Sequence, residues 1–582
     1  MTAPLAAEPG QQPLFTHRQI LTIFAGLMAG MFLAALDQTI VATSIRTIAD
    51  DLNGLSLQAW VTTAYLITAT LTTPLYGKLS DIYGRKPLFL FAITVFVLGS
   101  IACTFSGSMY QLAGFRALQG IGAGGLFSLA LTIVSDIVPP RERAAYQGYF
   151  VAVFGTASVL GPLAGGFLAG QSSLLGITGW RWVFLVNVPI GIVALFVVAK
   201  VLNLPHQPRE ARVDWPGAAA LSVGLVPLLL VAEQGRAWGW SSVASLTCYG
   251  ITVVGLALFL YVEHRYGDDA LLPLRFFRHR VFGLATAASL IVGMGMFGGM
   301  ASLPLYLQIV KGASPTEAGL LTLPLMAGVM SMSIYSGRAI RRTGNVRVWP
   351  IRGISLMIAG LALMTLVGVD TPFWQTACAM LVFGWGLGSI MQPLIMVVQN
   401  SMPARDMGVA TASATFFRQM GGTLGTAVFL SILFSTVQGK VASAFQTALP
   451  TPALQGALTD PSVLANPADQ AVVRAVSGGG VVSLDDTSFL SHIDARLARP
   501  FLEGFSASMT LVFVVAAVVM VIALVLVSFI PPIVLRDKSG LETQRAEAEA
   551  AAVPVAIPEQ AVAVSTREAW TPNQPRDTEH AG

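Results

Sequence analysis

The chain has 582 residues, of which 54% are hydrophobic and only 11% carry a charge. Soluble domains usually carry about 25% charged residues, so this composition excludes an ordinary soluble protein and fits one embedded in a lipid bilayer. The formal net charge of +4 is too small to indicate a nucleic-acid partner. The three cysteines, at positions 103, 248 and 378, lack metal-ligand spacing, so we expect no metal site.

Apolar segments that could cross a bilayer as helices recur along the chain, since such a helix needs about 20 mainly apolar residues. The predicted spans lie at roughly 20–43, 58–77, 88–105, 110–135, 145–169, 182–203, 214–232, 245–263, 282–305, 316–335, 348–368, 374–397, 408–434 and 507–530. These fourteen spans predict an all-α integral membrane protein, and their even number places both termini on the same side of the membrane.

Lysine and arginine decide which side that is, because short cytoplasmic loops carry an excess of both residues. The loop after the second predicted span holds Lys78, Arg85 and Lys86, and the alternate loops that follow also contain arginine. The intervening short loops hold few lysines or arginines. The sequence therefore predicts a multi-pass protein of the cell membrane with both termini in the cytoplasm.

The spans group into two bundles of six helices with two helices inserted between them. From the N-terminus, the predicted parts are a cytoplasmic leader (1–19), an N-terminal bundle (20–203), the two inserted helices with their cytoplasmic loops (204–281), a C-terminal bundle (282–435 and 507–530), a long extracytoplasmic loop (436–506) and a cytoplasmic tail (531–582). The loop is rich in Ala, Ser and Pro. The tail is rich in Ala, Glu and Pro and poor in aromatic residues, so we expect it to be disordered.

Glycine spacing in the two bundles indicates an internal repeat. The loop Gly77–Lys86 after the second span has a counterpart at Gly337–Gly344 after the tenth. A set of three alternating glycines in the fourth span recurs in the twelfth: Gly120, Gly122 and Gly124, then Gly384, Gly386 and Gly388. Many transporters are built from such repeats and bind their substrate at the interface between them.

Short motifs, taken together and in this order, resemble those of the major facilitator superfamily and of its fourteen-helix drug:proton antiporter branch. The resemblance lies in the first-helix motif at 36–41, the signature loop at 77–86, the fourth-helix motif at 115–122, the antiporter motif at 155–166, and the segments 180–189 and 214–217. It covers roughly residues 18–435 and the last span. It implies the major facilitator fold and proton-coupled export of drug-like molecules.

Two charged residues fall inside predicted spans of the N-terminal bundle. A carboxylate in lipid is costly, so Asp37 in the outer half of the first span is expected to be functional, and burial favours its protonated form. Arg116 in the fourth span has Met380 as its repeat counterpart, so the scaffold itself does not require an arginine there. The resemblance implies that both residues take part in proton coupling. The alternatives are a helix-end polar residue for Asp37 and snorkelling to an interface for Arg116.

The loop after the second span contains an acid within a basic, glycine-bounded segment. We expect Asp81, Arg85 and Lys86, together with Gly77 and Gly84, to form a latch that pairs charges with neighbouring helix ends on the cytoplasmic face. The alternative, a simple cytoplasmic anchor, would need Arg85 and Lys86 but not the acid or the glycines.

The antiporter motif in the fifth span combines Gly155, Gly161, Pro162, Gly165 and Gly166. Glycines allow neighbouring membrane helices to approach closely, and a proline removes a backbone hydrogen bond and bends its helix. Simple packing accounts for part of this pattern, and the resemblance adds a role in antiport.

Candidates for lining a central substrate cavity are aromatic or charged residues within the predicted spans. They are Trp60, Tyr65, Phe150, Phe154, Tyr306, Phe416, Phe417 and Arg418. The acids Glu233 and Glu263 fall at the ends of the inserted spans, and spans nine to fourteen contain no clear acid near their middle. Such a cavity suits neutral, monocationic or lipid-like amphiphiles better than dications.

The sequence thus favours an exporter that uses the proton gradient, without a cofactor, to expel amphipathic compounds. One alternative is an exporter of a lipid or siderophore with the same fold, in which the loop 436–506 meets an envelope partner. Another is a membrane sensor or interaction protein whose outer loop or tail is the working part. An enzyme is disfavoured, because the sequence holds no phosphate-binding loop, metal cluster or nucleophile–histidine pair.

Overall fold

The computed structural model describes residues 15–54, 57–143, 146–205, 212–477, 490, 493–533, 535–536 and 538–552. Most of the predicted leader and the tail beyond residue 552 lie outside these ranges. Most described residues belong to α-helices, and the sheet among them is a short antiparallel hairpin of β1 (Ser173–Leu174) and β2 (Ile177–Thr178). The predicted all-α membrane fold is confirmed.

The N-terminal bundle packs six long helices of the described chain around apolar interiors. They are α1 (His17–Asp51), α2 (Gln58–Tyr83), α3 (Arg85–Thr104), α4 (Met109–Ile137), α6 (Gln147–Ala169) and α8 (Asn187–Val201), with the short α5 (Pro140–Arg143), η3 (Gly179–Arg181) and α7 (Trp182–Leu185) between them. Local sequence sets several boundaries. Thr16 begins α1 with a capping box that includes Gln19, and Ser108 caps α4. Gly84, with a φ of 93°, separates α2 from α3, because few other residues adopt that backbone conformation.

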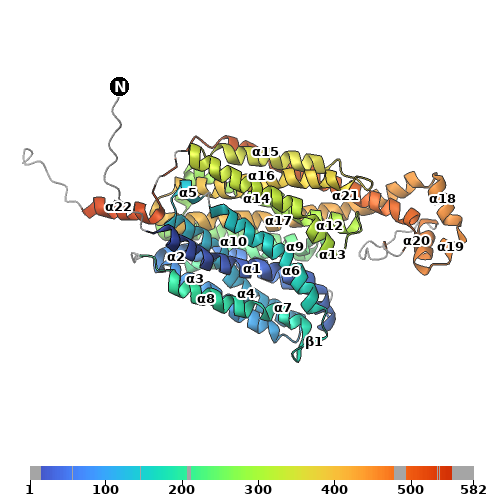
Figure 1. The fold of residues 1–582 in the computed structure, drawn as a ribbon, viewed down its shortest axis with the longest axis horizontal. Coiled ribbons are helices and arrows are strands. Elements are labelled where there is room, and N and C mark those ends of the chain that lie inside the picture. Colours follow the sequence, from blue (N-terminus) through green and yellow to red (C-terminus); the bar gives the residue numbers. More distant parts are fainter. Residues whose placement is uncertain are drawn as a thin grey trace, which may run out of the picture.

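The C-terminal bundle repeats this arrangement, and Figure 1 shows the two bundles side by side. Its helices are α12 (Arg280–Ile309), α14 (Leu323–Thr343), α15 (Val348–Met364), α16 (Phe373–Ser401), α17 (Met407–Ala448) and α21 (Ala495–Ser528), with the short α11 (Leu274–Arg278), α13 (Pro315–Leu321) and η5 (Ala404–Asp406). In order, these six long helices occupy the places of α1, α2, α3, α4, α6 and α8, because corresponding helix pairs pack together in both bundles. The repeat read from glycine spacing is therefore present in three dimensions.

The inserted hairpin consists of α9 (Trp215–Trp238) and α10 (Val243–Tyr266), followed by the 3-10 turn η4 (Gly267–Asp269). Asp214 caps α9 by accepting a hydrogen bond of 2.7 Å from the Gly217 N–H. Gly224 and Gly255 carry no side chains, so the backbones of α9 and α10 meet there. α9 packs against α2 and α17, which places the hairpin at a seam between the bundles rather than inside either one.

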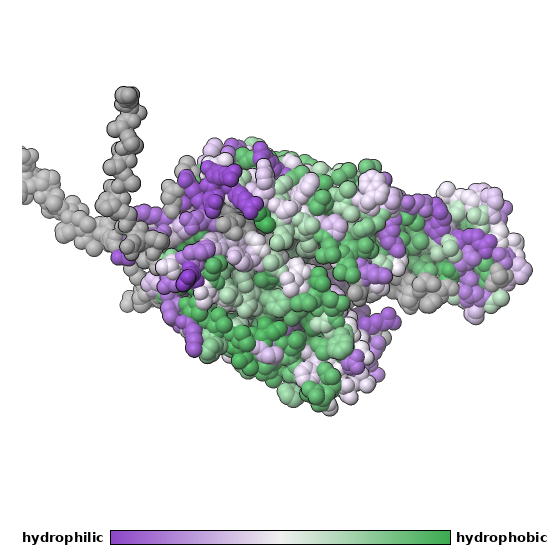
Figure 2. All heavy atoms as spheres, in the orientation of Figure 1, coloured by the Kyte–Doolittle hydropathy of each residue, from purple (hydrophilic) through white to green (hydrophobic). Residues whose placement is uncertain are grey.

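Twelve of the described helical segments are long and apolar enough to cross a bilayer. The predicted spans 58–77 and 348–368 correspond to α2 and α15, which do not meet the same criteria of length and hydropathy. The count of fourteen membrane spans therefore stays a prediction. Figure 2 shows apolar residues over much of the middle of the visible face and polar residues gathered toward its ends, as expected of a molecule that spans a bilayer.

The segment 436–506 is not an irregular loop over its described residues. α17 continues to Ala448, then α18 (Pro452–Thr459), α19 (Pro461–Leu464) and α20 (Pro467–Ser477) follow, and α21 begins at Ala495. Together they form a lobe, here called the α18–α20 lobe, that projects beyond the bundles (Figure 1). Leu454, Ala457, Leu497 and Phe501 are buried there in an apolar core continuous with that of the C-terminal bundle. This core stabilises helices in a segment whose composition suggests a linker.

The predicted disorder of the tail is wrong for residues 540–552, which form α22 (Gly540–Ala552). Ser539 and Glu542 make a capping box at its start, in which the Ser539 N–H donates to Glu542 Oε2 at 2.7 Å and the Glu542 N–H donates to Ser539 Oγ at 3.3 Å. α22 packs against η5 and the end of α4. It lies at the opposite end of the molecule from the α18–α20 lobe (Figure 1).

Candidate functional site: a buried ion pair and a latch between the bundles

An ion pair between α1 and α4 lies inside the N-terminal bundle. Arg116 Nη1 is 2.5 Å from Asp37 Oδ2, and the two side chains are 2% and 0% exposed. The sequence singles out both residues for proton coupling, and the structure places them in direct contact. Removing one partner of such a buried pair typically costs about 3–5 kcal/mol, because the other charge stays desolvated.

Three more polar side chains complete the cluster around Asp37. Gln119 Nε2 and Asn187 Nδ2 each donate to Asp37 Oδ1 at 2.8 Å. Gln119 Nε2 also donates to Ser100 Oγ at 2.6 Å, and Gln119 Oε1 accepts from Arg116 Nη1 at 2.6 Å. The carboxylate therefore receives hydrogen bonds from three side chains: Arg116, Gln119 and Asn187.

The cluster also contains polar atoms without a partner. Arg116 lies over the Tyr65 ring, with 4.1 Å between Arg116 Cζ and the ring centroid. Arg116 Nε, Asn187 Oδ1 and the Tyr65 hydroxyl make no hydrogen bond with any described residue. Unsatisfied buried polar atoms are unusual in proteins, so this cluster has spare donors and acceptors for a rearranged state.

Sequence reasoning missed the role of these supporting residues. Gln119 belongs to the fourth-helix motif and Asn187 to the segment 180–189, and motif membership is the only sequence signal for either. Ser100 carries no signal, because a serine in a membrane helix commonly bonds its own backbone. Tyr65, expected in the substrate cavity, is 1% exposed and lies against Arg116 instead.

Asp81 joins the two bundles at the end of the molecule that carries α22. Its carboxylate accepts hydrogen bonds from the backbone N–H groups of Gly408 at 3.1 Å and Val409 at 3.0 Å, in the first turn of α17. The first N–H groups of a helix lack partners within the helix and carry partial positive charge, so they bind carboxylates well. The latch expected from the sequence thus has a direct structural counterpart.

Arg85 fixes the position of the Asp81 carboxylate within the N-terminal bundle. Its guanidinium lies 2.5 Å from Asp81 Oδ1 and 2.8 Å from Asp136 Oδ2 at the end of α4. A Cβ on Gly77 would overlap Ala412 of α17, so glycine allows α2 and α17 to meet at this point. The acid, the arginine and the glycine therefore serve one interbundle contact.

Lys86 does not take part in this interbundle contact and meets a helix end within its own bundle instead. Its Nζ donates to the Ala199 carbonyl and to Asn203 Oδ1, both at 2.7 Å, at the end of α8 in the same bundle. The latch is also one-sided, because Arg341 stands at the repeat position of Asp81 in the C-terminal bundle. A cation there cannot bind the start of a helix as a carboxylate does.

The glycines of the antiporter motif divide into two groups along α6. A side chain on Gly161 would overlap Thr39 of α1, and one on Gly165 would overlap Thr43. Thr39 Oγ1 also donates to a backbone carbonyl of α6 at 2.9 Å, so α1 and α6 are in close contact beside Pro162. The other glycines have no neighbour within 4 Å of where a Cβ would stand: Gly155 and Gly166.

The predicted cavity residues do not converge on one chamber. Four of them pack or hydrogen-bond inside a bundle or against α9: Phe150, Tyr306, Phe416 and Phe417. The Tyr306 hydroxyl, for example, donates to the Gly368 carbonyl at 3.0 Å. Part of the surface is exposed in Trp60, Phe154 and Arg418, as it also is in Phe150 and Phe417, so these residues stay candidates for substrate contact.

Two six-helix bundles related by a repeat, with a buried ion pair in one and a latch between them, form the architecture of a secondary transporter. The comparison with known families agrees with this class. The chain belongs to the Major Facilitator Superfamily, whose family model matches residues 27–426.

Relatives named as transporters align with most of the chain. An uncharacterized MFS-type transporter of Mycobacterium tuberculosis is 34% identical over 540 residues, which are 92% of this chain and 73% of that protein. The multidrug transporter protein MdtP of Bacillus subtilis is 31% identical over 537 residues, which are 91% of this chain and 96% of that protein. The resemblance to multidrug exporters read from the motifs is confirmed.

Solved structures of the same superfamily share the fold. The proton:xylose symporter XylE, bound to 6-bromo-6-deoxy-D-glucose, matches with a TM-score of 0.54 and 15% sequence identity, over 91% of this chain and 100% of that chain. At this identity the match bears on architecture alone. It supports the arrangement of two related bundles described above.

Proposed function

We propose that this transporter is a proton-coupled antiporter that exports amphipathic small molecules. The observation that carries the proposal is the buried pair of Asp37 and Arg116, which the C-terminal bundle lacks because Met380 stands at the repeat position of the arginine. Ionisable residues within membrane helices are costly and mark ion or proton pathways. The name of the relative MdtP supports drug-like cargo.

Asp37 is the group that carries the proton in this proposal, because arginine stays charged in proteins. Its carboxylate is fully buried and accepts hydrogen bonds from Arg116, Gln119 and Asn187. Protonation removes the negative charge and turns one carboxylate oxygen into a donor. Arg116 then loses its counterion, so the contact between α1 and α4 rearranges as the proton binds.

Alternating access follows from the latch. Asp81 holds the start of α17 against α2, so the bundles are in contact at this end. Uptake of a compound from this side requires the carboxylate to leave Gly408 and Val409, and closure forms the same bonds again. The basic residues of the adjoining loops support a cytoplasmic location for this end. Rocking of two repeats around a central site is a general mechanism of such transporters.

Charge at the bundle interface limits the expected substrates. α12, α14, α15, α16 and α17 contain no Asp or Glu, and the charge of Asp37 is already balanced by Arg116. A dication would find no second acid to balance it. A monocation could compete with Arg116 for Asp37, and a neutral amphiphile needs no counterion. These two classes are therefore the expected cargo.

A second function, export of a lipid or another envelope-directed amphiphile, is favoured by the α18–α20 lobe. Cargo of this kind needs a partner outside the membrane, and a folded lobe offers a surface for one. Arg496 pairs with Asp460 at 3.0 Å and with Asp494 at 2.9 Å, which fixes the base of the lobe. Hydrogen bonds from Arg496 hold the pKa of Asp494 below its usual range. Neither function involves catalysis or a nucleic acid.

Transport by the purified protein in liposomes tests the main proposal. Vesicles with an imposed pH gradient should move neutral and monocationic amphiphiles against their own gradient while protons move in the opposite direction. Export that continues unchanged after the pH gradient is collapsed would reject proton coupling. Selective movement of lipid-like compounds alone would favour the second function.

A further inference from the structure

α22 lies across the boundary between the two bundles, at the end that carries the latch. The chain leaves α21 in the C-terminal bundle and reaches α22 through a short connection. α22 contacts the end of α4 in the N-terminal bundle and η5, which precedes α17, in the C-terminal bundle. One short segment thus touches both of the bundles that separate when this end opens.

The attachment to the C-terminal bundle consists of a buried side chain and several hydrogen bonds. Leu535 is 2% exposed and belongs to the core of that bundle. Arg536 donates through its backbone N–H to Asn400 Oδ1 at 3.0 Å and through Nη2 to the Met402 carbonyl at 2.9 Å. Gln544 Nε2 donates to a carbonyl of η5 at 2.9 Å. This side is held by polar bonds as well as by the covalent connection to α21.

The attachment to the N-terminal bundle includes an apolar contact. Leu541 packs against the core of that bundle. Gly540 lies beside the end of α4, where an added Cβ would be 3.0 Å from Asp136 Oδ1 and 3.2 Å from the Ser135 carbonyl. Asp136 is the acid that pairs with Arg85 in the latch. α22 therefore packs directly on the residues that position Asp81.

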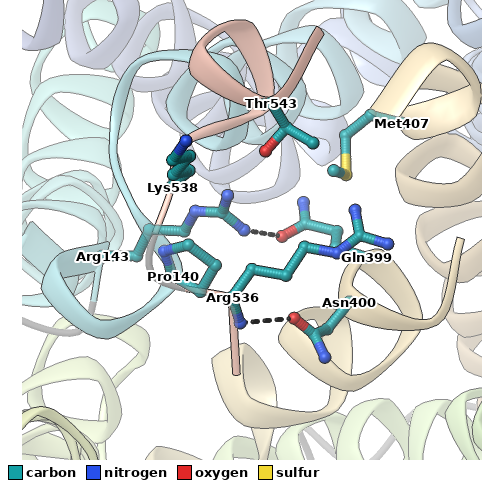
Figure 3. Close-up of a pocket in the computed structure, with 9 residues that line it drawn as sticks. Pro140, Arg143, Gln399, Asn400, Met407, Arg536, Lys538 and Thr543 are labelled. Carbon is teal, nitrogen blue, oxygen red and sulfur yellow. Dashed lines mark hydrogen bonds between the residues drawn. The ribbon is translucent and has the colours of Figure 1, made fainter. Parts of the chain in front are cut away.

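A small pocket marks the place where the tail meets both bundles (Figure 3). Arg143 of α5 and Gln399 of α16 point toward each other beside it, with 2.5 Å between Arg143 Nη1 and Gln399 Oε1. Arg536 and Thr543 of the tail line the same pocket. The tail thus packs at an interbundle contact that is separate from the hydrogen bonds of Asp81.

We propose that residues 535–536 and 538–552 form a strap that stabilises the closed cytoplasmic gate and leaves the N-terminal bundle when the gate opens. The inference rests on the alternating-access part of the proposed function, but not on the cargo or on proton coupling. The hydrogen bonds of Arg536 and Gln544 and the covalent link lie on the C-terminal side, so the strap stays on that bundle. Leu541 then leaves its apolar site, and its contact exists in the closed state alone. A contact present in one state shifts the equilibrium between the two, whereas a contact kept in both does not.

Distances between the bundles test the strap without any substrate or proton gradient. The native cysteines Cys103, Cys248 and Cys378 are first replaced by serine. Spin labels at Tyr83→Cys on α2 and Thr343→Cys on α14, both exposed in the structure, then report the separation of the cytoplasmic ends in lipid nanodiscs. Because neither cargo nor coupling enters the measurement, a failure of proton-driven export in liposomes would not alter its outcome.

Leu541→Ala should raise the ratio of long to short separations roughly fivefold to tenfold, the effect of losing part of a leucine's apolar burial in one state. Truncation after Ile533 removes the whole strap and should raise the ratio of long to short separations at least as much as Leu541→Ala does. This result does not depend on whether α22 still folds in Leu541→Ala. Gln544→Ala is the matched control and should leave the ratio within about twofold, because its bond is kept in both states. Unchanged separations in Leu541→Ala and in the truncation overturn the strap. A shift in the truncation that Leu541→Ala fails to reproduce overturns the assignment to the α22–α4 contact.

Discussion

Asp81 on α2 and Gly408 at the start of α17 are joined by a hydrogen bond of 3.1 Å across the boundary between the bundles. The same carboxylate lies 2.5 Å from Arg85. One side chain thus balances a cation in its own bundle and binds the N-terminus of a helix in the other. Asparagine would keep an oxygen acceptor but lose the charge that both partners require.

We expect Asp81→Asn to weaken the closed gate by about 1–2 kcal/mol, since it removes a charge-assisted contact with a helix N-terminus. The spin-label pair at Tyr83 and Thr343 would then report more of the long separation, and export would slow. Asp268→Asn is the control, because the Asp268 side chain is 66% exposed and pairs with Arg275 on the same face of the molecule. If both variants keep wild-type separations and transport, the loop containing Asp81 serves only as a membrane anchor.

The two groups of glycines in α6 predict opposite outcomes for one kind of substitution. Gly161→Ala should destabilise the bundle by about 1–3 kcal/mol, because its Cβ would overlap Thr39 and force α1 and α6 apart. Gly155→Ala meets no atom and should be neutral, or stabilising by up to about 1 kcal/mol through helix propensity. Thermal unfolding in detergent compares the two variants. Equal losses of stability would contradict the contact between α1 and α6 described here.

Orientation can be read from cysteines placed at opposite ends of the molecule. Gln446 is exposed on the extension of α17 toward the α18–α20 lobe, and Thr343 is exposed at the end of α14. In the background without native cysteines, Gln446→Cys should react with an impermeant thiol reagent in intact cells. Thr343→Cys should react only after permeabilisation. The opposite pattern would place the lobe in the cytoplasm and reverse the predicted topology.

Cargo selection should follow charge. Matched pairs of amphiphiles that differ by one cationic group test whether a second positive charge impairs export. We expect that it does, because Asp37 is already paired with Arg116 and α12, α14, α15, α16 and α17 contain no Asp or Glu. A second charge left without a counterion in a low-dielectric site should reduce the transport rate at least about tenfold. Equal rates for the two members of each pair would show that another group balances the dication.

The bundles and the latch were accessible from sequence because they depend on periodic and local signals. Span length gives the helices, and paired glycines such as Gly120 and Gly384 give the repeat, since close helix contact leaves few alternatives to glycine. The acid in the basic loop marks Asp81, but its partners are backbone N–H groups of α17, which carry no side-chain signature. The contact of Asp81 with α17, a helix far away in the sequence, could therefore be identified only from the structure.

For other features, overall composition is a poorer guide than the local pattern of residues. The tail looks disordered by its Ala, Glu and Pro content, yet Ser539 and Glu542 have capping-box spacing and strong helix formers follow them. Tyr306 is a cavity candidate on aromatic character alone, and its structural role becomes visible only through its hydrogen bond to the Gly368 carbonyl. The role of Asn187 also becomes visible only in the structure, because its hydrogen bond to Asp37 joins residues 150 positions apart.

The ion pair of Asp37 and Arg116 makes a prediction that separates folding from coupling. Asp37→Asn removes the titrating group but leaves Arg116 buried without a counterion, which should cost about 3–5 kcal/mol of stability. The double variant Asp37→Asn with Arg116→Gln removes both charges and should recover most of that loss. Neither variant has a proton carrier in the pair, so neither should export against a gradient.

Proton movement driven by cargo, measured in liposomes with a pH-sensitive dye, decides the question. The wild-type protein should move protons when cargo is added, whereas both Asp37 variants should bind cargo, and exchange it down its gradient, without proton flux. Met380→Ala, at the repeat position of Arg116, is the control and should retain coupling because no charge is changed. If the double variant regains stability and still couples protons to cargo at the wild-type ratio, Asp37 is not the carrier. Glu233 on α9 would then be the next acid to test, because α9 is an apolar helix that packs against α2.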